Sequence, residues 1–431
     1  MKRNLMLLLM ALLLMPASAQ LSRKEIKENI FRSGSNYYAY PGPQQVSLTP
    51  APNGYEPFYI SHYGRHGSRH LISNGDYDRA YRPLLKADSL GQLTPLGKDV
   101  LRRLTMIRNE ARHRHGELTL RGAEQHRGIA HRMYERFPEV FKGKTNIDAK
   151  STVVIRCILS MENALQELSS LNPQLQIRHD ASEHDMWYMN FDAKDISKKR
   201  RNEQVNKALE DFKKRHGHYD RLMDTLFLDM NYVRENVDAS SLNYYLWKQA
   251  SNIQSTELRH NLSLYDIFTE EEMYQNWLIE NASWYVSYGA CKLNGTVMPF
   301  SQRNLLRMMI QEADSCLRYE HPGATLRYGH EVCVMPLACL LEMDNCGLQT
   351  DNLEELEQKE WYNYRIFPMA CNIQLVFYKR KGSHAEANDI LVKALLNENE
   401  TTLPLPKVSG PYYRWTDFRD YYLQKLNNYR E

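Results

Sequence analysis

Short runs of strand-forming residues alternate with helical patterns along much of the chain. The runs are rich in β-branched and aromatic residues, and they cover 58–63, 152–155, 175–178, 324–329 and 373–378. Between the first two runs, apolar residues recur at helical spacing over 96–113 and 118–137, and Thr119 can cap the second of these helices. This alternation predicts an α/β fold with its functional side chains at the carboxyl ends of strands.

A different pattern occupies the middle of the chain. From about residue 180 to 298 the segments are long, charged and amphipathic, as at 202–215 and 270–288, with no convincing strand. The 431 residues also exceed one ordinary core of about 150 residues. We therefore expect a signal peptide at 1–19, a first part of an α/β catalytic core at 20–180, a helical insertion lobe at 181–298, and the second part of the core at 299–431.

The N-terminus has the three parts of a secretory signal. Lys2 and Arg3 precede an apolar run at 5–15, and Ala17, Ser18 and Ala19 provide a small-x-small cleavage site. A membrane-spanning helix needs about 20 apolar residues, so this run is too short to be an anchor. No later window is long and apolar enough to span a bilayer. The sequence thus predicts a secreted or periplasmic protein without a membrane span after cleavage.

Net charge and cysteine content limit which partners the chain can bind and which cysteine motifs it can form. The chain carries 55 Lys and Arg against 52 Asp and Glu, and two of the basic residues lie in the removable segment, so the mature chain is nearly neutral. We therefore expect no nucleic-acid partner, because such binding usually needs a basic excess. The seven cysteines allow up to three disulfides in an oxidising compartment, and none of their spacings is that of a CxxC motif.

A dense polar cluster follows the first predicted strand. The run Y-G-R-H-G-S-R-H at 63–70 contains two arginines four residues apart, on either side of a histidine and a glycine. Arginine forks can hold the oxygens of a tetrahedral oxyanion, and the glycine lets the backbone approach a ligand closely. The cluster therefore indicates an oxyanion site beside a nucleophile or base. Taken alone, it could equally be a solvated loop of basic residues.

Four motifs in order resemble those of one family. The run R-H-G-S-R at 65–69 resembles the R-H-G-x-R signature of the histidine acid phosphatases, the second branch of the histidine phosphatase superfamily. Residues 116–125 resemble its G-x-L-T-x-x-G-x-x-Q segment, and residues 150–160 resemble its R-S-T-x-x-x-R-x-x-x-S segment. The run Y-G-H-E at 328–331 resembles its late histidine and acid pair. The resemblance implies a phosphoglycerate-mutase-like α/β core sheet flanked by helices, with a mostly helical inserted lobe.

The resemblance also implies a role for each matching residue. His66 would attack phosphorus and form a phosphohistidine, and Glu331 would donate a proton to the leaving group. The phosphate oxygens would be held by Arg65, Arg69, Arg156 and His330. No metal and no other cofactor is expected, and the partner is a small-molecule phosphomonoester substrate.

Three positions depart from the family pattern. Leu71 replaces a proline that usually follows the first motif. Lys150 replaces an arginine at the start of the third motif, a position that is not expected to touch phosphate. The late pair is His-Glu, where phosphatases and phytases of the family usually have His-Asp and inositol polyphosphate phosphatases have His-Ala-Glu. A zinc H-E-x-x-H motif is not formed either, because Val334 stands where its second histidine is required.

The substrate is less constrained than the reaction. The His-Glu pair favours a phytase or a multiple inositol polyphosphate phosphatase, with a general acid phosphatase as the near alternative. A noncatalytic phosphate-ligand binding protein and a phosphomutase-like transferase also remain open. The predicted lobe and the segment just before it carry several basic residues, which could line a pocket for a multiply charged ligand or could face water. These residues are Arg178, His179, Lys198, Lys199 and Arg200.

Overall fold

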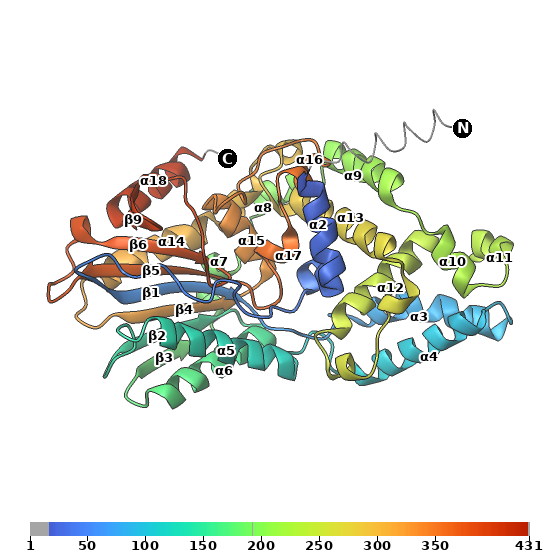
Figure 1. Cartoon of the computed structure of the whole chain (residues 1–431), viewed down its shortest axis with the longest axis horizontal. Helices are drawn as coiled ribbons and strands as arrows, with labels where there is room; N and C mark the ends of the chain where they lie inside the picture. Colours follow the sequence, from blue (N-terminus) through green and yellow to red (C-terminus); the bar gives the residue numbers. More distant parts are fainter. Residues whose placement is uncertain (1–16, 192, 430–431) are drawn as a thin grey trace.

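The computed structural model describes residues 17–191 and 193–429 (Figure 1). Helix α2 (Ala17–Glu28) opens the described part of the chain. The predicted signal peptide falls mainly on residues 1–16, which lie outside the described residues. Its proposed cleavage site after Ala19 lies within α2.

A single mixed sheet forms one half of the molecule. Within the described residues it has nine strands in the order β3-β2-β4-β1-β5-β6-β9-β8, with β7 beside β6. The strands are β1 (Tyr55–Arg65), β2 (Asn146–Ser151), β3 (Gln176–Asp180), β4 (Gly323–Gly329), β5 (Asn372–Arg380), β6 (Leu391–Leu396), β7 (Asn399–Glu400), β8 (Lys407–Ser409) and β9 (Tyr412–Arg414). The first four in the sheet order pair in parallel, and β5 runs antiparallel to β1.

Register brings the ends of three parallel strands together. In β1 and β4, Arg65 pairs with Gly329, and in β2 and β4, Ser151 pairs with Tyr328. The residues that follow β1, β2 and β4 therefore leave the sheet at one edge. This is the edge at which ligands bind in open parallel sheets.

Helices cover both faces of the sheet, as Figure 1 shows. One face carries α5 (Leu120–Arg136) and α6 (Ile155–Leu171), and the other carries α14 (Arg303–Cys316), α15 (Glu331–Leu340) and α18 (Trp415–Asn428). Alternation along β1 supplies both cores, since Ile60 packs with the α5 and α6 layer and Tyr59 with the opposite layer. This is the expected α/β class, with helices flanking a central sheet.

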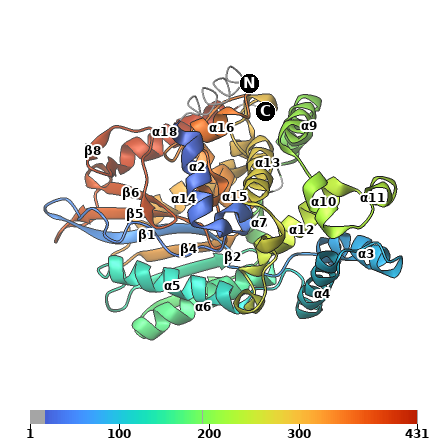
Figure 2. The same ribbon diagram turned by 45° about the vertical axis from the view of Figure 1, so that its right-hand side comes forward.

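The other half of the molecule is helical. Between β3 and β4, the described residues form helices and loops but no strand. These helices are η2 (Glu183–Asp185), α7 (Met186–Met189), α8 (Lys194–Ser197), η3 (Lys198–Arg201), α9 (Glu203–His216), α10 (Asp220–Leu226), α11 (Met230–Asn236), α12 (Ala239–Ile253), η4 (Glu257–His260), η5 (Tyr265–Ile267), α13 (Glu270–Tyr288), η6 (Lys292–Asn294) and η7 (Met298–Gln302), followed by α14. Earlier helices α3 (Asn74–Ser89) and α4 (Pro95–Glu110) lie beside α10 and α12 (Figures 1 and 2) and share a core with them.

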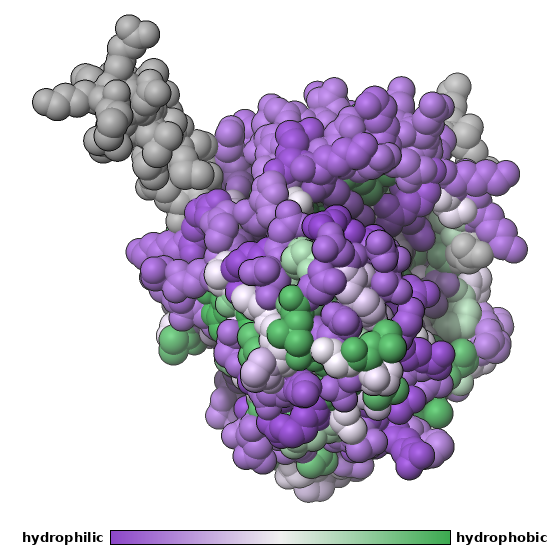
Figure 3. Space-filling model, turned by 90° about the vertical axis from the view of Figure 1, so that its right-hand side faces the viewer, coloured by the Kyte–Doolittle hydropathy of each residue, from purple (hydrophilic) through white to green (hydrophobic). Residues whose placement is uncertain are grey.

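The remaining helices are short segments near the sheet and its edge. They are η1 (Ile30–Tyr37), α16 (Glu355–Gln358), α17 (Asn363–Ile366) and η8 (Ala387–Asp389). The end of the molecule that carries α3 and α10 is mostly hydrophilic, with single hydrophobic residues scattered over it (Figure 3). Every helix in the described part of the chain is too short or too polar to cross a membrane.

One predicted strand is wrong. The run at 152–155 was assigned to the sheet because it is β-branched, but β2 ends at Ser151 and α6 begins at Ile155. Val153 and Ile155 are exposed, so burial does not hold this run in an extended form. Strand propensity is overridden where the chain reaches the sheet edge and turns into a helix. The other four predicted strands overlap β1, β3, β4 and β5.

All seven cysteines lie in the described part of the chain and are free thiols. Six of them are buried and Cys316 is partly exposed. The disulfides that the cysteine count allowed are therefore not formed, and the two halves of the molecule are held together by noncovalent contacts, among them the hydrogen bond from Asn252 to the carbonyl of Arg69.

Candidate active site

The loop after β1 is fixed at the sheet edge by its backbone. The amide of Arg65 donates to the carbonyl of Cys371 at 2.8 Å, and the amide of His66 donates to the carbonyl of Gly329 at 2.9 Å. These two hydrogen bonds hold the start of the loop between the end of β4 and the residue before β5. The predicted site residues Arg65, His66 and Arg69 all lie in it.

Side chains from the second and third motifs hold this loop from the α5 and α6 side. Thr119 Oγ1 donates to the carbonyl of Ser68 at 3.0 Å, and Gln125 Oε1 accepts from the amide of Ser68 at 2.8 Å. Ser160 Oγ accepts from the amide of Gly67 at 3.1 Å. These motif residues therefore position the loop, a role that the sequence alone did not assign.

Two glycines allow the loop to lie directly on α5. A Cβ at Gly67 would stand 2.4 Å from the carbonyl oxygen of Gly122, and a Cβ at Gly122 would stand 2.2 Å from the carbonyl oxygen of Ser68. Both distances are far below van der Waals contact with backbone atoms. The G in the first motif and the second G in the second motif are thus required by the same contact.

His66 has one ring nitrogen committed and one available. Its Nδ1 lies 2.9 Å from the carbonyl oxygen of Gly67, and a carbonyl can only accept, so Nδ1 carries the proton. Nε2 is buried, has no hydrogen-bond partner among the described residues, and lies 3.7 Å from a carboxylate oxygen of Glu331. Burial, helped by the charges of Arg65 and Arg69, lowers the pKa of His66 well below its ordinary value. The ring is therefore neutral, with a lone pair on Nε2.

Three guanidinium groups surround this nitrogen. Arg65 is fully buried and donates through Nη1 to the carbonyls of Asn36 at 2.6 Å and Phe367 at 3.2 Å. Its Nη2, and the Nε atoms of Arg69 and Arg156, are buried without a hydrogen-bond partner in the described part of the chain. Buried donors are normally satisfied, so unpartnered donors on three cations indicate an anion site.

Two of these contacts could not be found from sequence. Asn36 and Phe367 hold Arg65 through their backbone carbonyls, so no side-chain motif marks them. They come from η1 and from the segment before β5, which lie far from Arg65 in the sequence.

His330 and Glu331 approach from the end of β4. The His330 ring stands 5.7 Å from the His66 ring at a steep angle, and its Nε2 lies 3.3 Å from Thr152 Oγ1. Burial lowers the pKa of His330 to about 4, although the charge of Glu331 opposes this shift. A carboxylate oxygen of Glu331 lies 3.0 Å from Arg65 Nε. The structure therefore brings five predicted site residues together on two strand ends, and Arg156 joins them from α6.

The carboxyl of Glu331 is ionised before a substrate binds. Burial by itself would raise the pKa of Glu331, but the charges of Arg65, Arg69 and His330 outweigh it and lower the pKa to about 2. A bound phosphate dianion would offset those cations and raise the proton affinity of Glu331 again. The carboxyl can thus carry a proton in the complex although it carries none in the free site.

The same residues form a three-donor group that a metal could in principle use. One ligand atom each from His66, His330 and Glu331 lie within 4.8 Å of one another. The guanidinium groups of Arg65 and Arg69 act on the same atoms, and two of the donors are the nucleophile candidate and the acid candidate. A cation would be repelled by the charges that attract phosphate, so the electrostatics of the site favour an anion.

Other candidate cations lie away from these residues or are paired. Lys150 Nζ lies 3.2 Å from Glu312 and donates to the Tyr188 hydroxyl, so it does not reach the phosphate donors. Arg178 and His179 lie on the edge strand β3, where they pair with Asp148 and Glu162, respectively. Their possible role in lining a ligand pocket is therefore not supported.

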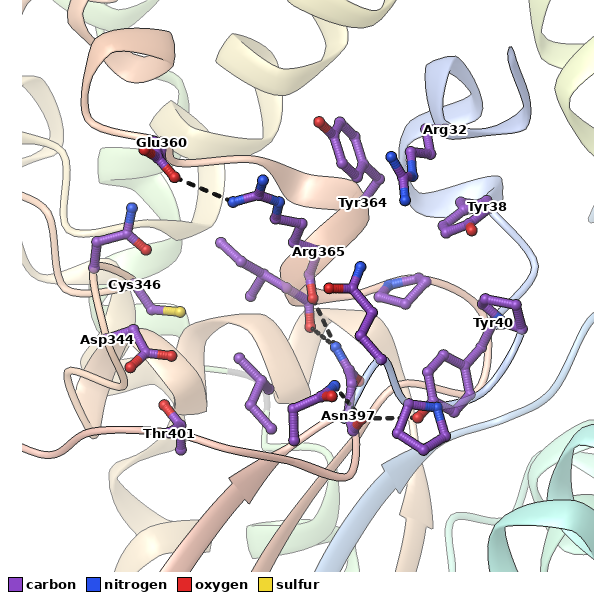
Figure 4. Close-up of a pocket in the computed structure, with 18 of the residues that line it drawn as sticks. Arg32, Tyr38, Tyr40, Asp344, Cys346, Glu360, Tyr364, Arg365, Asn397 and Thr401 are labelled. Atoms are coloured by element: carbon purple, nitrogen blue, oxygen red, sulfur yellow. Dashed lines mark hydrogen bonds and ion pairs between the residues drawn. The ribbon is translucent and has the colours of Figure 1, made fainter. Parts of the chain in front are cut away.

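A separate hollow of about 830 Å³ is lined by Arg32, Tyr38 and Arg365, among other residues (Figure 4). Arg365, which lines it, pairs with Glu25 and Glu360, and Arg32 pairs with Glu25. Asn397 donates to the carbonyl of Arg365. Both arginines of the hollow are thus paired with acids, unlike the arginines at the sheet edge, some of whose buried donors have no partner among the described residues.

The geometry defines a class of protein. An α/β sheet presents a neutral histidine with a free Nε2, three converging arginines and a carboxyl, which together suit transfer of a phosphoryl group through a histidine. The chain belongs to branch 2 of the histidine phosphatase superfamily, whose family model matches residues 107–397. Membership makes it a phosphatase of the histidine acid type and confirms the resemblance of its motifs. The matched range begins after residue 70, so the placement of His66 rests on the geometry above.

Solved structures share the fold at low identity. The multiple inositol polyphosphate phosphatase of Bifidobacterium longum in complex with phosphate has a TM-score of 0.76 and 18% identity, covering 92% of this chain and 98% of that one. The phytase from D. castellii has a TM-score of 0.67 and 14% identity, with 93% and 86% covered. The Hafnia alvei phytase in complex with tartrate has a TM-score of 0.55 and 12% identity, with 87% and 98% covered. No curated protein sequence matches the chain at a significant level.

Proposed function

We propose that the chain is an exported phosphomonoester hydrolase that acts through a phosphohistidine on His66, with inositol polyphosphates such as phytate as its substrates. The observation that carries the proposal is the state of the His66 ring. Its Nδ1 proton is held by the Gly67 carbonyl, and its Nε2 is unpartnered amid three arginines. Such a ring is ready to attack an electrophile at pH values where a free histidine would be protonated.

The residues divide the reaction into two displacements. Nε2 of His66 attacks phosphorus in line with the leaving oxygen, and Arg65, Arg69, Arg156 and His330 hold the other phosphate oxygens. Glu331, protonated in the complex, donates its proton to the leaving alkoxide. It then accepts a proton from the water that cleaves the phosphohistidine and releases inorganic phosphate.

Support for an inositol polyphosphate substrate comes from two sources. The structural neighbours include a multiple inositol polyphosphate phosphatase and several phytases. The acid beside His330 is a glutamate, the residue type that inositol polyphosphate phosphatases of the family use. The alternative is a general acid phosphatase, because the same residues could hydrolyse other phosphomonoesters.

The test measures release of inorganic phosphate by the mature protein and by His66→Ala. Phytate and an aryl phosphate are the substrates, each with and without EDTA. We expect release from both substrates that is lost in the variant and indifferent to EDTA. The ratio of kcat/KM between the substrates then separates a phytase from a general phosphatase.

Two outcomes would contradict the proposal. Loss of activity with EDTA, restored by a divalent cation, would assign the His66, His330 and Glu331 group to a metal. No release from either substrate by a folded protein would favour a noncatalytic phosphate binder.

Export is tested separately, because a cleaved signal predicts that the protein recovered outside the cytoplasm begins at Gln20.

We also propose that the insertion at 181–298 forms one lobe facing the sheet edge. Helices α3 and α4, which precede it in the sequence, share a core with α10 and α12, whereas α9 and α13 pack in the core that also contains α14 and α15. Their contact with α10 and α12 would hold this lobe over the end of the sheet.

A further inference from the structure

The basic run at 198–201 contains one cation unlike its neighbours. Lys198, Lys199 and Arg201 of η3 are exposed, whereas Arg200 is half-buried. The guanidinium carbon of Arg200 lies 4.2 Å from the centre of the Tyr288 ring, which is close contact for a cation over an aromatic face. Its Nε is buried without a hydrogen-bond partner, and no carboxylate of the described residues forms an ion pair with it.

Tyr288 connects this cation to the site. Its ring stacks on Trp284 at 5.2 Å, and Trp284 packs against Phe367 at 5.0 Å. The carbonyl of Phe367 is one of the two acceptors that hold Arg65. The last turns of α13 therefore lie close to the residues that hold Arg65. Phe367, Trp284 and Tyr288 follow one another in contact, and Arg200 lies over the Tyr288 ring.

The charges of both Arg200 and the proposed acid act on the Tyr288 hydroxyl. Burial raises the pKa of Tyr288, the charge of Arg200 lowers it, and the charge of Glu331 raises it. The Tyr288 hydroxyl thus lies within electrostatic reach of both groups.

Another basic side chain on the helical side is neutralised by a partner. Lys248 of α12 lies near Tyr37, whose ring is 5.9 Å from the Arg69 guanidinium, but its ammonium is 2.6 Å from Asp76. Arg200 has no such carboxylate. A guanidinium over an aromatic ring can still donate hydrogen bonds to a ligand, and its fork of N–H groups matches two oxygens of a phosphate.

We propose that Arg200, held in place by Tyr288, is a specificity-determining residue that binds a second phosphate of the substrate while the first phosphate lies at His66. This inference rests on the proposed function, since it names the residue by which that site would prefer polyphosphates over monophosphates. It requires only that the substrate carry a second phosphate on the side of the ring that faces α13.

The experiment compares two inhibitors of aryl phosphate hydrolysis. Inositol hexasulfate reports binding of a multiply charged ring, and inorganic phosphate reports the His66 site alone. We expect Arg200→Ala to raise the Ki of inositol hexasulfate about tenfold or more, the loss typical of a charge-assisted contact, and to change the Ki of phosphate less than twofold. Lys199→Ala is the matched control, because its side chain is exposed on the same turn and should change neither value.

Variants of the ring test how Arg200 is held. Tyr288→Phe keeps the stacking face and should keep the wild-type Ki for inositol hexasulfate, whereas Tyr288→Leu should approach Arg200→Ala. Equal changes in both Ki values for Arg200→Ala, or equal changes for Lys199→Ala and Arg200→Ala, would overturn the proposal. If the wild-type protein does not hydrolyse the aryl phosphate, the proposed function has failed. Calorimetric binding of inositol hexasulfate to the wild type, Arg200→Ala and Lys199→Ala then decides the role of Arg200 by itself.

Discussion

At the scale of single residues, the protonation of Glu331 links substrate binding to catalysis. The arginines that attract phosphate also keep this carboxyl ionised, with a pKa of about 2 in the free site. The substrate reverses that effect, because its negative charge lies among the same cations. An acid that is protonated only in the complex cannot act before the phosphate is in place.

The first prediction concerns this acid. Glu331→Gln keeps the size of the side chain but removes its proton, so the effect should depend on how much the leaving group needs one. We expect kcat to fall about 10²-fold or more with an alkyl phosphate, and much less with a nitrophenyl phosphate whose phenolate leaves unaided. The measurement is kcat on both substrates for the wild type and the variant.

A second readout separates proton donation from a general disturbance of the site. If Glu331 only supported Arg65 through their 3.0 Å contact, both substrates would lose activity equally. Equal losses would therefore remove Glu331 from the role of proton donor. A pH profile on the alkyl substrate should also lose its basic limb in the variant, since that limb reports the acid in the complex.

At the scale of elements, the contact between the β1 loop and α5 decides whether the site forms. Gly67 and Gly122 meet backbone to backbone, and Thr119 and Gln125 of the same region hold Ser68. Helix α5 begins at Leu120 with Thr119 as its N-cap, so the cap residue holds both the helix and the loop. The loop geometry is thus set by the first turns of α5.

The second prediction uses two glycines of this one helix. Gly122→Ala would place a methyl 2.2 Å from the carbonyl oxygen of Ser68, so we expect a loss of about 1–3 kcal/mol in unfolding free energy and most of the activity. Gly128→Ala meets no backbone atom, only Nη1 of Arg132 at 3.0 Å, which is not one of the two nitrogens that donate to Glu398. It should therefore gain up to about 0.5–1 kcal/mol, because alanine favours a helix interior. Urea unfolding and kcat measure both effects.

The comparison of the two variants is the control. Both add one methyl group to α5, so a difference in sign cannot come from the helix itself. If Gly122→Ala were as stable and as active as Gly128→Ala, the loop would not depend on this contact.

Sequence alone could predict the elements with clear periodic signals. The predicted segment at 270–288 matches α13 from end to end, because its apolar spacing is a local signal, and the structure adds a capping box at Thr269. The strand expected at 152–155 failed because β-branched residues there lie at a sheet edge that only the tertiary fold defines. The site residues carried motif signals, but the carbonyls of Asn36 and Phe367 and the stacking of Arg200 on Tyr288 depend on distant segments meeting.

At the scale of the whole molecule, the fold buries several histidines in their neutral form. Burial lowers the pKa of His330 to about 4, and it lowers the pKa values of His62 in β1 and of His126 in α5 to about 3. The unfolded chain binds protons at these rings near pH 6.5, but the folded chain does not until the pH is far lower. The unfolding free energy should therefore fall as the pH drops from about 6.5 to about 4.

The last prediction tests that slope. Each such histidine contributes up to about 1.4 kcal/mol per pH unit in this range. Glu331 adds to the slope only at the acidic end, because its lowered pKa stabilises the fold above its ordinary value of 4.5 and this stabilisation is lost from about pH 5 down towards pH 2. His126→Phe removes one buried ring of α5, which meets the backbone of Arg65, and should flatten the dependence of unfolding free energy on pH. His131→Gln, which removes a surface histidine whose pKa is raised by the Glu167 contact, should not flatten it. Urea titrations between pH 4.5 and 7 measure the slopes, and an unchanged slope in His126→Phe would show that this ring is protonated in the folded protein.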